Sequence, residues 1–328
     1  MNYSGRKVLV TGGTGMIGRY LVDLLVERGA TVRVASLDEA SRAHPQAEFR
    51  RVNLTDMCEC VAVCQGMEMV FHLAGVKGSP LMTKTKPASF FVPTIAFNTN
   101  MMEAARQAGV DRYLFTSTVG VYAPAAVFHE DDVWKTFPSE NDRFAGWAKR
   151  VGELQAEAYR IEHGWDKVAI VRPANVYGRW DNFDLNNAMV IPALIRRALD
   201  GEDPLVVWGD GSPVRDFVHG SDVAEGMLAA MERVEKTPVN LGSGEGVSIR
   251  RLVEIVVSNM PKAPRVVWDS TKPSGDAKRL MDITRARAMG WAPRVSIEDG
   301  IKDLMGWYLE NRSEVDKRHN TFNTSKLM

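Results

Sequence analysis

The sequence predicts an α/β protein: a doubly wound parallel sheet, the Rossmann fold, followed by a smaller mixed α/β lobe. Three observations predict this architecture. Strand-like apolar segments alternate with amphipathic helical segments over the first half of the chain. A glycine-rich turn follows the first strand and opens the first helix. After Gly178, glycines and prolines break the chain into shorter elements.

The first half alternates strands and helices in chain order. We expect strands at 7–11, 31–35, 49–52, 69–73, 113–117 and 167–172. We expect helices between them at 16–28, 56–64, 95–108 and 145–162. Such alternation forms right-handed βαβ crossovers, and these give a parallel sheet covered on both faces.

The glycine-rich turn is Thr-Gly-Gly-Thr-Gly-Met-Ile-Gly, residues 11–18. Gly12 lets the chain turn off the strand, Gly15 lets the backbone approach a pyrophosphate, and Gly18 lets the helix pack on the sheet. The first helical turn, with Met16 and Ile17, offers free N–H groups and a positive dipole end to phosphates. The turn therefore predicts a dinucleotide site.

The second half has shorter strands, such as 205–208 and 239–241, and helices at 188–200, 221–232, 249–259 and 297–311. We therefore predict a dinucleotide-binding domain over 1–178, with interleaved segments near 205–245. A mainly substrate-binding lobe is predicted over 179–312, and a flexible tail over 313–328 because that segment is polar and without periodicity.

Composition excludes several classes of function. Lysine plus arginine, 41, equals aspartate plus glutamate, so neither nucleic acid nor an anionic membrane is an expected partner. No apolar run reaches the length of a membrane span, and the first strand follows directly on the N-terminus, which predicts a cytoplasmic protein. The cysteines Cys58, Cys60 and Cys64 cluster without histidines at zinc spacing, so we expect free thiols and no metal site.

Further motifs follow the glycine turn in a fixed order. They are Asn-Leu-Thr-Asp (53–56), His-Leu-Ala-Gly (72–75), Phe-Thr-Ser-Thr-Val-Gly-Val-Tyr (115–122), Lys149, Arg-Pro-Ala-Asn-Val-Tyr-Gly (172–178) and Arg-Asp-Phe-Val-His (215–219). By these residues the chain resembles the extended short-chain dehydrogenases, specifically the NAD-dependent nucleotide-sugar epimerases and dehydratases. It is nearest in motif to their GDP-fucose synthase-like members.

The resemblance implies reversible hydride transfer between a nicotinamide and sugar C4. In the family a tyrosinate takes the hydroxyl proton, its pKa lowered by a lysine four residues later, and a serine or threonine shares the hydrogen bond. Thr118 matches that hydroxyl, with Ser117 beside it, and Lys149 matches the lysine. Ala145 stands where the tyrosine belongs. Either the tyrosine was replaced to disable an enzyme, or a natural member has moved its base.

Two more departures narrow the implied reaction. GDP-fucose synthases carry a cysteine and a histidine for inversion at C3 and C5, and here those positions hold Gly120 and Trp180. The Asp-Glu pair of dehydratases is replaced by Val119 and Gly120. Redox chemistry at C4 remains: epimerisation, or net reduction of a 4-keto sugar.

The resemblance also implies the cofactor contacts. The second strand ends at Ser36, where family members that use NAD carry an acid, and Asp38 follows two residues later. Asp38 favours NAD, with NADP as the alternative because Arg33 and Arg42 are near. Further expected cofactor contacts are Asn53, Leu54, Leu73, Ala74, Gly75, Lys149 and Pro173.

The expected partner is a nucleotide-diphosphate sugar, with GDP favoured. Asn175, Arg215 and Arg279 are expected at the diphosphate, because arginine binds phosphate with a bidentate fork. Lys77 and Ser79 are expected at the cleft, and Val190 and Trp208 in the substrate lobe. His219 and Asp222 match a family pattern that we interpret as structural.

Three functions stay open: a C4 epimerase with bound NAD, a 4-keto reductase using NADPH, and a non-catalytic dinucleotide sensor. Ala145 favours the sensor, whereas the retained Thr118, Lys149, Asn175 and Arg215 favour an enzyme. The helices 95–108 and 145–162 are rich in small and apolar residues, and with the resemblance they predict a homodimer through a four-helix interface.

Overall fold

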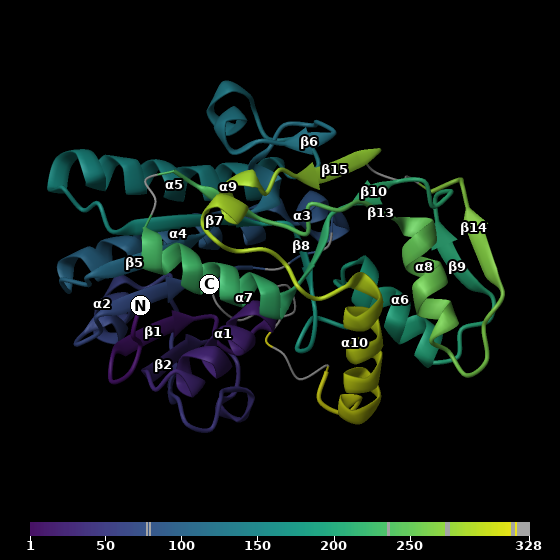
Figure 1. Ribbon diagram of the computed structural model, residues 1–328, viewed down its shortest axis with the longest axis horizontal. Coiled ribbons are helices and arrows are strands. Elements are labelled where there is room, and N and C mark those ends of the chain that lie inside the picture. Colours follow the sequence, from purple (N-terminus) through teal and green to yellow (C-terminus); the bar gives the residue numbers. More distant parts are fainter. Residues whose placement is uncertain (77, 79, 235–236, 273–275, 316–318, 320–328) are drawn as a thin grey trace.

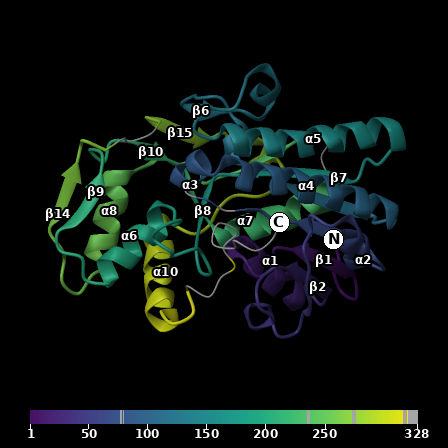
Figure 2. The same cartoon turned by 180° about the vertical axis from the view of Figure 1, so that it is seen from behind.

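The computed structural model describes residues 1–76, 78, 80–234, 237–272, 276–315 and 319 (Figure 1). The two opposite views show a larger body that contains the central sheet and a smaller body of helices and short strands beside it (Figures 1 and 2). The second body is formed largely by residues that follow Gly178 in the chain.

Within the described residues the central sheet has seven strands in the order β12-β7-β5-β4-β1-β2-β3, and every neighbouring pair is parallel. The order runs outward in both directions from β1, which is the doubly wound arrangement that the sequence predicted. The strands are β1 (Lys7–Thr11), β2 (Thr31–Ser36), β3 (Glu48–Arg51), β4 (Met69–His72), β5 (Arg112–Thr116), β7 (Val168–Pro173) and β12 (Val239–Leu241).

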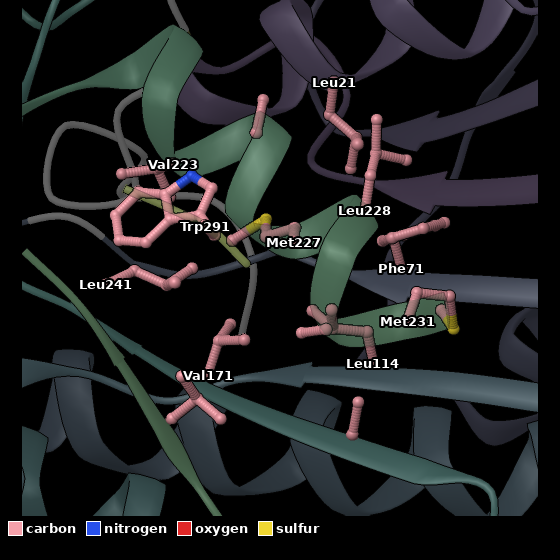
Figure 3. Packing of buried hydrophobic residues seen from close by; sticks show 14 of the residues in the cluster. Leu21, Phe71, Leu114, Val171, Val223, Met227, Leu228, Met231, Leu241 and Trp291 are labelled. Atoms are coloured by element: carbon pink, nitrogen blue, oxygen red, sulfur yellow. The ribbon is translucent and has the colours of Figure 1, made fainter. Parts of the chain in front are cut away.

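Helices cover both faces of this sheet. On one face α1 (Met16–Glu27) and α7 (Gly220–Arg233) bury one core cluster, in which Leu21, Met227 and Leu228 lie over Phe71 and Leu114 (Figure 3). On the other face a second cluster is buried by α2 (Met57–Cys64), α4 (Pro87–Gln107) and α5 (Arg143–His163). Several predicted site residues follow directly on the carboxyl ends of β1, β2, β4 and β5.

Helix α4 begins earlier than the sequence pattern indicated. The prediction started it at residue 95, after both Pro87 and Pro93, and proline disfavours a helix interior. In the structure Pro87 occupies the first turn, where no N–H partner is lost, and Pro93 is accommodated inside the helix. The added turns extend α4 towards the carboxyl edge of the sheet.

The smaller body contains α6 (Val190–Leu199), α8 (Ile249–Ser258) and α10 (Ile297–Asn311), which share a third core cluster. Short strands also lie outside the central sheet; the sequence predicted the one at 205–208, whereas the others were missed because two to four residues show no periodicity. The short strands are β6 (Val127–Phe128), β8 (Asn175–Tyr177), β9 (Leu205–Trp208), β10 (Val214–Arg215), β11 (Phe217–His219), β13 (Val247–Ser248), β14 (Val266–Asp269) and β15 (Lys278–Met281).

These short strands form three small sheets, of which the pair β9–β14 lies at the outer end of the smaller body (Figures 1 and 2). A four-stranded sheet has the order β13-β10-β15-β6, and β8 pairs with β11 while β9 pairs with β14. Short helices complete the described elements: α3 (Pro80–Thr85), α9 (Thr284–Ala288), η1 (Ala40–Arg42), η2 (Val119–Val121) and η3 (Glu130–Lys135). In the parallel pair β10–β15, Arg215 lies directly beside Arg279.

Candidate active site

Two glycines of the turn between β1 and α1 have no room for a side chain. Gly12 has φ +68°, and an added Cβ there would lie 3.0 Å from the backbone nitrogen of Ala74. A Cβ on Gly18 would lie 2.2 Å from the carbonyl oxygen of Gly12. Gly15 is the N-cap of α1, and no side chain caps that helix end. The free N–H groups and the bare backbone fit a pyrophosphate.

The end of β2 is tied to the glycine turn. The hydroxyl of Thr14 donates to the Asp38 carboxylate at 2.7 Å and lies 2.7 Å from the hydroxyl of Ser36. Asp38 is buried, and its other carboxylate oxygen accepts the backbone N–H of His319 at 2.7 Å. The segment predicted as a flexible tail thus reaches the predicted ribose carboxylate at this one described residue, and Val315 in the same segment is buried.

The other predicted cofactor residues also lie along the carboxyl edge of the sheet. The backbone N–H groups of Leu73 and Ala74, after β4, both donate to the Thr11 hydroxyl at 3.1 Å. Gly75 is exposed, and Pro173 is the buried last residue of β7. Beyond β3, the side-chain oxygen of Asn53 accepts from Thr55, and Leu54 is buried. Lys77 and Ser79 lie outside the described residues.

The two predicted hydroxyls after β5 have different surroundings. Thr118 is half-buried at the start of η2, and its hydroxyl accepts the backbone N–H of Gly120 at 3.2 Å. Ser117 is buried, and its hydroxyl donates to Glu153 at 2.5 Å. Glu153 in turn forms two hydrogen bonds with the fully buried Arg172, at 2.6 and 2.9 Å. The Ser117 proton is therefore used within a buried ion-pair network. The Thr118 hydroxyl accepts a hydrogen bond and can still donate its own proton to a ligand.

Ala145 lies in the first turn of α5, and this turn packs on the segment after Thr118. An added Cβ on Gly146 would lie 2.4 Å from the carbonyl oxygen of Gly120, so the helix and η2 touch through backbone. Lys149 follows one turn later on the same helix face. Its ammonium lies 3.3 Å from the amide oxygen of Asn98 and 5.0 Å from the centre of the Phe115 ring.

Burial lowers the pKa of Lys149 to about 7, although the negative charge of Glu153 acts in the opposite direction. Burial also lowers the pKa of His72 to about 3, and the nearby charge of Lys149 contributes to that shift. The imidazole of His72 is therefore neutral at neutral pH. The sequence analysis assigned no role to His72 or Asn98. Asn98 could have been noticed as a polar amide on the apolar face of a predicted helix.

A pair of arginines lies beside the amino end of α5. Arg279 forms an ion pair with Asp142, the N-cap residue of α5, at 2.6 Å. Arg215, its neighbour in the adjacent strand, donates to the backbone oxygen of Asp276 at 2.6 Å. Burial and the positive charge of Arg279 lower the pKa of Arg215. Two half-buried guanidinium groups side by side form a suitable site for an anion.

The remaining predicted substrate residues are spread over several elements. Asn175 in β8 donates its side-chain amide to the backbone oxygen of Asp216 at 3.0 Å. Val190 begins α6, and Trp208 is exposed at the end of β9, with the ammonium of Lys272 6.0 Å from its ring. His219 caps α7 with its side chain, which agrees with a structural role.

The residues that replace the cysteine and histidine of GDP-fucose synthases offer no acid or base. Trp180 has φ +60°, an uncommon backbone conformation for a residue with a side chain. Its ring packs edge-on against Tyr20, with 5.0 Å between ring centres, and lies 6.1 Å from Trp307. At Gly120 an added Cβ would lie 3.2 Å from Cβ of Asp142, so a cysteine there would press on that residue.

The described part of the chain has no helix long and apolar enough to cross a membrane. It also has no group of three or more histidine, cysteine, aspartate or glutamate side chains suited to a metal ion. The three cysteines are free thiols, and burial raises the pKa of Cys60 and Cys64 to about 12.

Comparison with known proteins finds one family by its sequence model, by related sequences and by solved structures. Residues 8–242 match the NAD dependent epimerase/dehydratase family. The chain is 33% identical to GDP-L-fucose synthase 1 of Arabidopsis thaliana over 324 residues, which covers 95% of each chain. The structure of UDP-glucose 4-epimerase from Thermotoga maritima, with UDP-glucose, has a TM-score of 0.79 at 27% identity and covers 93% of this chain and 99% of its own. The NAD complex of the same enzyme from Thermus thermophilus has a TM-score of 0.79 at 27% identity, covering 92% and 99%.

Proposed function

The chain belongs to the NAD dependent epimerase/dehydratase family, and from that premise we propose that it acts on C4 of a nucleotide-diphosphate sugar, GDP-linked by preference. The proposed reaction is reversible hydride transfer with NAD bound at the glycine turn. The proposed outcome is C4 epimerisation, at a rate reduced because Ala145 stands in the place of the catalytic tyrosine.

The observation that carries the proposal is the arginine pair. Arg215 in β10 and Arg279 in β15 are neighbours across the two strands. Arg279 also forms an ion pair with Asp142, the N-cap residue of α5. An anion held by these guanidinium groups would lie beside the helix that carries Ala145 and Lys149. A dinucleotide sensor needs the glycine turn alone, so this second anion site supports an enzyme for phosphorylated sugars.

The cofactor supplies the hydride acceptor when bound, and the residues described here fit it. Gly12, Gly15 and Gly18 leave the turn bare, and the uncapped amino end of α1 faces the phosphate position. Asp38 would accept the ribose hydroxyls. A buried carboxylate repels a 2′-phosphate, and this favours NAD over NADP.

Oxidation at C4 requires a group that takes the hydroxyl proton as the hydride leaves. The Thr118 hydroxyl accepts from Gly120 N–H and keeps its own proton to share with the sugar oxygen. Lys149 would hold the nicotinamide ribose. The methyl group of Ala145 cannot accept a proton, so the step lacks its acid–base group. General acid–base catalysis contributes about two to four powers of ten in rate.

Titration calorimetry with GDP-, UDP- and dTDP-sugars tests the proposal, with the double variant Arg215→Met and Arg279→Met. We expect one nucleotide sugar to bind the unmodified chain and to lose at least tenfold in affinity with the double variant. Arg251→Met is the matched control, since its ion pair with Glu298 is exposed. Equal affinity in all three proteins would refute the diphosphate site.

The runner-up functions differ in measurable ways. A 4-keto reductase would consume added NADPH in stoichiometric turnover, whereas an epimerase would retain its dinucleotide and show no net oxidation. Arg42 lies 3.9 Å from Asp38 and is the observation that favours NADPH. A sensor would bind dinucleotide and no nucleotide sugar.

A further inference from the structure

The segment that follows α10 has contacts in both bodies of the molecule. Of this segment the structure describes residues 313–315 and 319. Val315 is only 4% exposed and belongs to the core cluster of the smaller body. The backbone N–H of His319 donates to Oδ1 of Asp38, beyond the end of β2, at 2.7 Å. The segment is therefore anchored in the smaller body and reaches the predicted cofactor site in the larger one.

A second contact joins this segment to the same part of the larger body. Arg42 of η1 donates from Nη1 to the backbone oxygen of Glu314 at 3.4 Å, and its Nε lies 3.9 Å from Oδ2 of Asp38. The backbone oxygen of Arg42 in turn accepts a hydrogen bond from Arg19 of α1 at 3.1 Å. Through Arg42 the segment is thus connected to the helix that follows the glycine turn.

Both carboxylate oxygens of Asp38 are engaged in this arrangement. Oδ2 accepts the Thr14 hydroxyl at 2.7 Å, and Oδ1 accepts the His319 N–H. The Asp38 residue is only 6% exposed. A ribose bound as proposed above needs this carboxylate to accept its hydroxyl groups. The N–H of His319 and a ribose hydroxyl would therefore compete for the same acceptor.

We propose that the segment after α10 is autoinhibitory: the backbone N–H of His319, anchored through Val315, occupies Asp38 and has to leave before NAD binds. The inference rests on the proposed function, because it takes Asp38 as the ribose carboxylate. The free protein then divides between a closed state, with His319 at Asp38, and an open state. Since NAD binds the open state, the apparent affinity for NAD is reduced by the fraction of open molecules.

The contact uses a backbone donor, and this makes a sharp test possible. Proline has no backbone N–H, so His319→Pro deletes the donor, whereas His319→Ala keeps it and is the matched control. Titration calorimetry should show NAD binding about tenfold tighter for His319→Pro, because a hydrogen bond to a charged group contributes about that factor or more. Binding to His319→Ala should equal binding to the unmodified chain. A tenfold gain corresponds to about nine closed molecules in ten.

A second variant tests the anchor. Val315→Asp places a carboxylate in the core cluster of the smaller body, where burial of a charge is costly, so the segment should leave that cluster. We expect this variant to bind NAD more tightly as well. Leu309→Asp is its control, because Leu309 lies on α10 and is 53% exposed. The two variants act at different places, so the test stays decisive if one of them fails to fold.

Hydrogen exchange follows the segment itself, without turnover. Peptides that contain His319 should exchange slowly in the ligand-free protein, and faster in Val315→Asp or when NAD saturates the unmodified chain. Slow exchange that persists with NAD bound would overturn the inference.

The calorimetry also separates this inference from the proposed function. Equal NAD affinity in the unmodified chain, His319→Pro and Val315→Asp would overturn the autoinhibition and leave the proposed cofactor site standing. Absence of NAD binding from all three proteins would refute the cofactor site, and the inference with it.

Discussion

The carboxylate of Asp142 lies 2.6 Å from the guanidinium of Arg279, although Asp142 occupies the N-cap position of α5. An aspartate at that position usually accepts backbone N–H groups of its own helix. Here the Asp142 side chain forms no cap hydrogen bond with α5, and its carboxylate pairs with an arginine from β15 instead. Asp142 therefore competes with any anion that the arginine pair would bind.

Removal of that competing charge should strengthen anion binding. We expect Asp142→Asn to lower the dissociation constant for GDP about three- to tenfold, because Arg279 loses its carboxylate partner and the site loses a repelling charge. Calorimetry measures this, with Asp132→Asn as control, since Asp132 pairs with the exposed Lys135 on η3. Weaker GDP binding in the Asp142 variant would contradict the competition.

Restoring a phenol at position 145 should restore catalysis. Ala145→Tyr should raise the rate of C4 epimerisation or 4-keto reduction about a hundredfold to ten-thousandfold, since it returns the acid–base group. Ala145→Phe supplies the ring without the hydroxyl and should not raise the rate. If the unmodified chain is already fast and Ala145→Tyr slows it, the base lies elsewhere.

A side chain at Gly15 should abolish cofactor binding without unfolding the protein. Gly15 has φ −82° and ψ 175°, which any residue adopts, so Gly15→Val blocks the phosphate position and leaves the backbone intact. Calorimetry should detect no NAD binding, while the melting temperature stays near that of the unmodified chain. Retained NAD affinity would place the phosphates away from α1.

We predict a homodimer formed through the outer faces of α4 and α5. Apolar residues recur on α5 at alternating spacings of three and four: Phe144, Trp147, Val151, Leu154, Ala158 and Ile161. Leu154 and Ile161 are 53% and 77% exposed in the single chain. Light scattering should give a dimer mass that falls to the monomer mass in a Leu154→Glu, Ile161→Glu variant. Leu309→Glu, at an exposed position of α10, is the control, and a monomeric unmodified chain would refute the interface.

Stability should fall in acid because of His72. Its pKa is about 3 in the folded protein, below the ordinary value of 6.5, so the unfolded chain binds a proton first. Its contribution to stability is present above pH 6.5 and is lost as pH falls towards 3, at about 1.4 kcal/mol per pH unit. Urea unfolding of His72→Gln should show a shallower acid slope, whereas His163→Gln at the exposed end of α5 should not.

The sequence predicted the elements whose signals are local. The glycine turn and the strands of the sheet were recognised because their patterns lie within a few residues of one another. The start of α4 was predicted too late, because a proline such as Pro93 normally indicates the end of a helix. The pairing of Arg215 with Arg279 and the contact of Asn98 with Lys149 depend on register and packing between distant segments. Such contacts leave no periodic signal: the resemblance placed both arginines at a diphosphate, but their strand register and the Asn98 contact appeared only with the fold.

The contact of Gly146 with the carbonyl of Gly120 has a consequence for how this protein could change over evolutionary time. The backbone contact between Gly146 and Gly120 fixes the position of residue 145, and the side chain at 145 takes no part in that contact. A substitution at 145 therefore changes chemistry while the scaffold stays as it is. We therefore expect that one substitution at 145 could remove or restore activity in a lineage while the protein stays folded throughout.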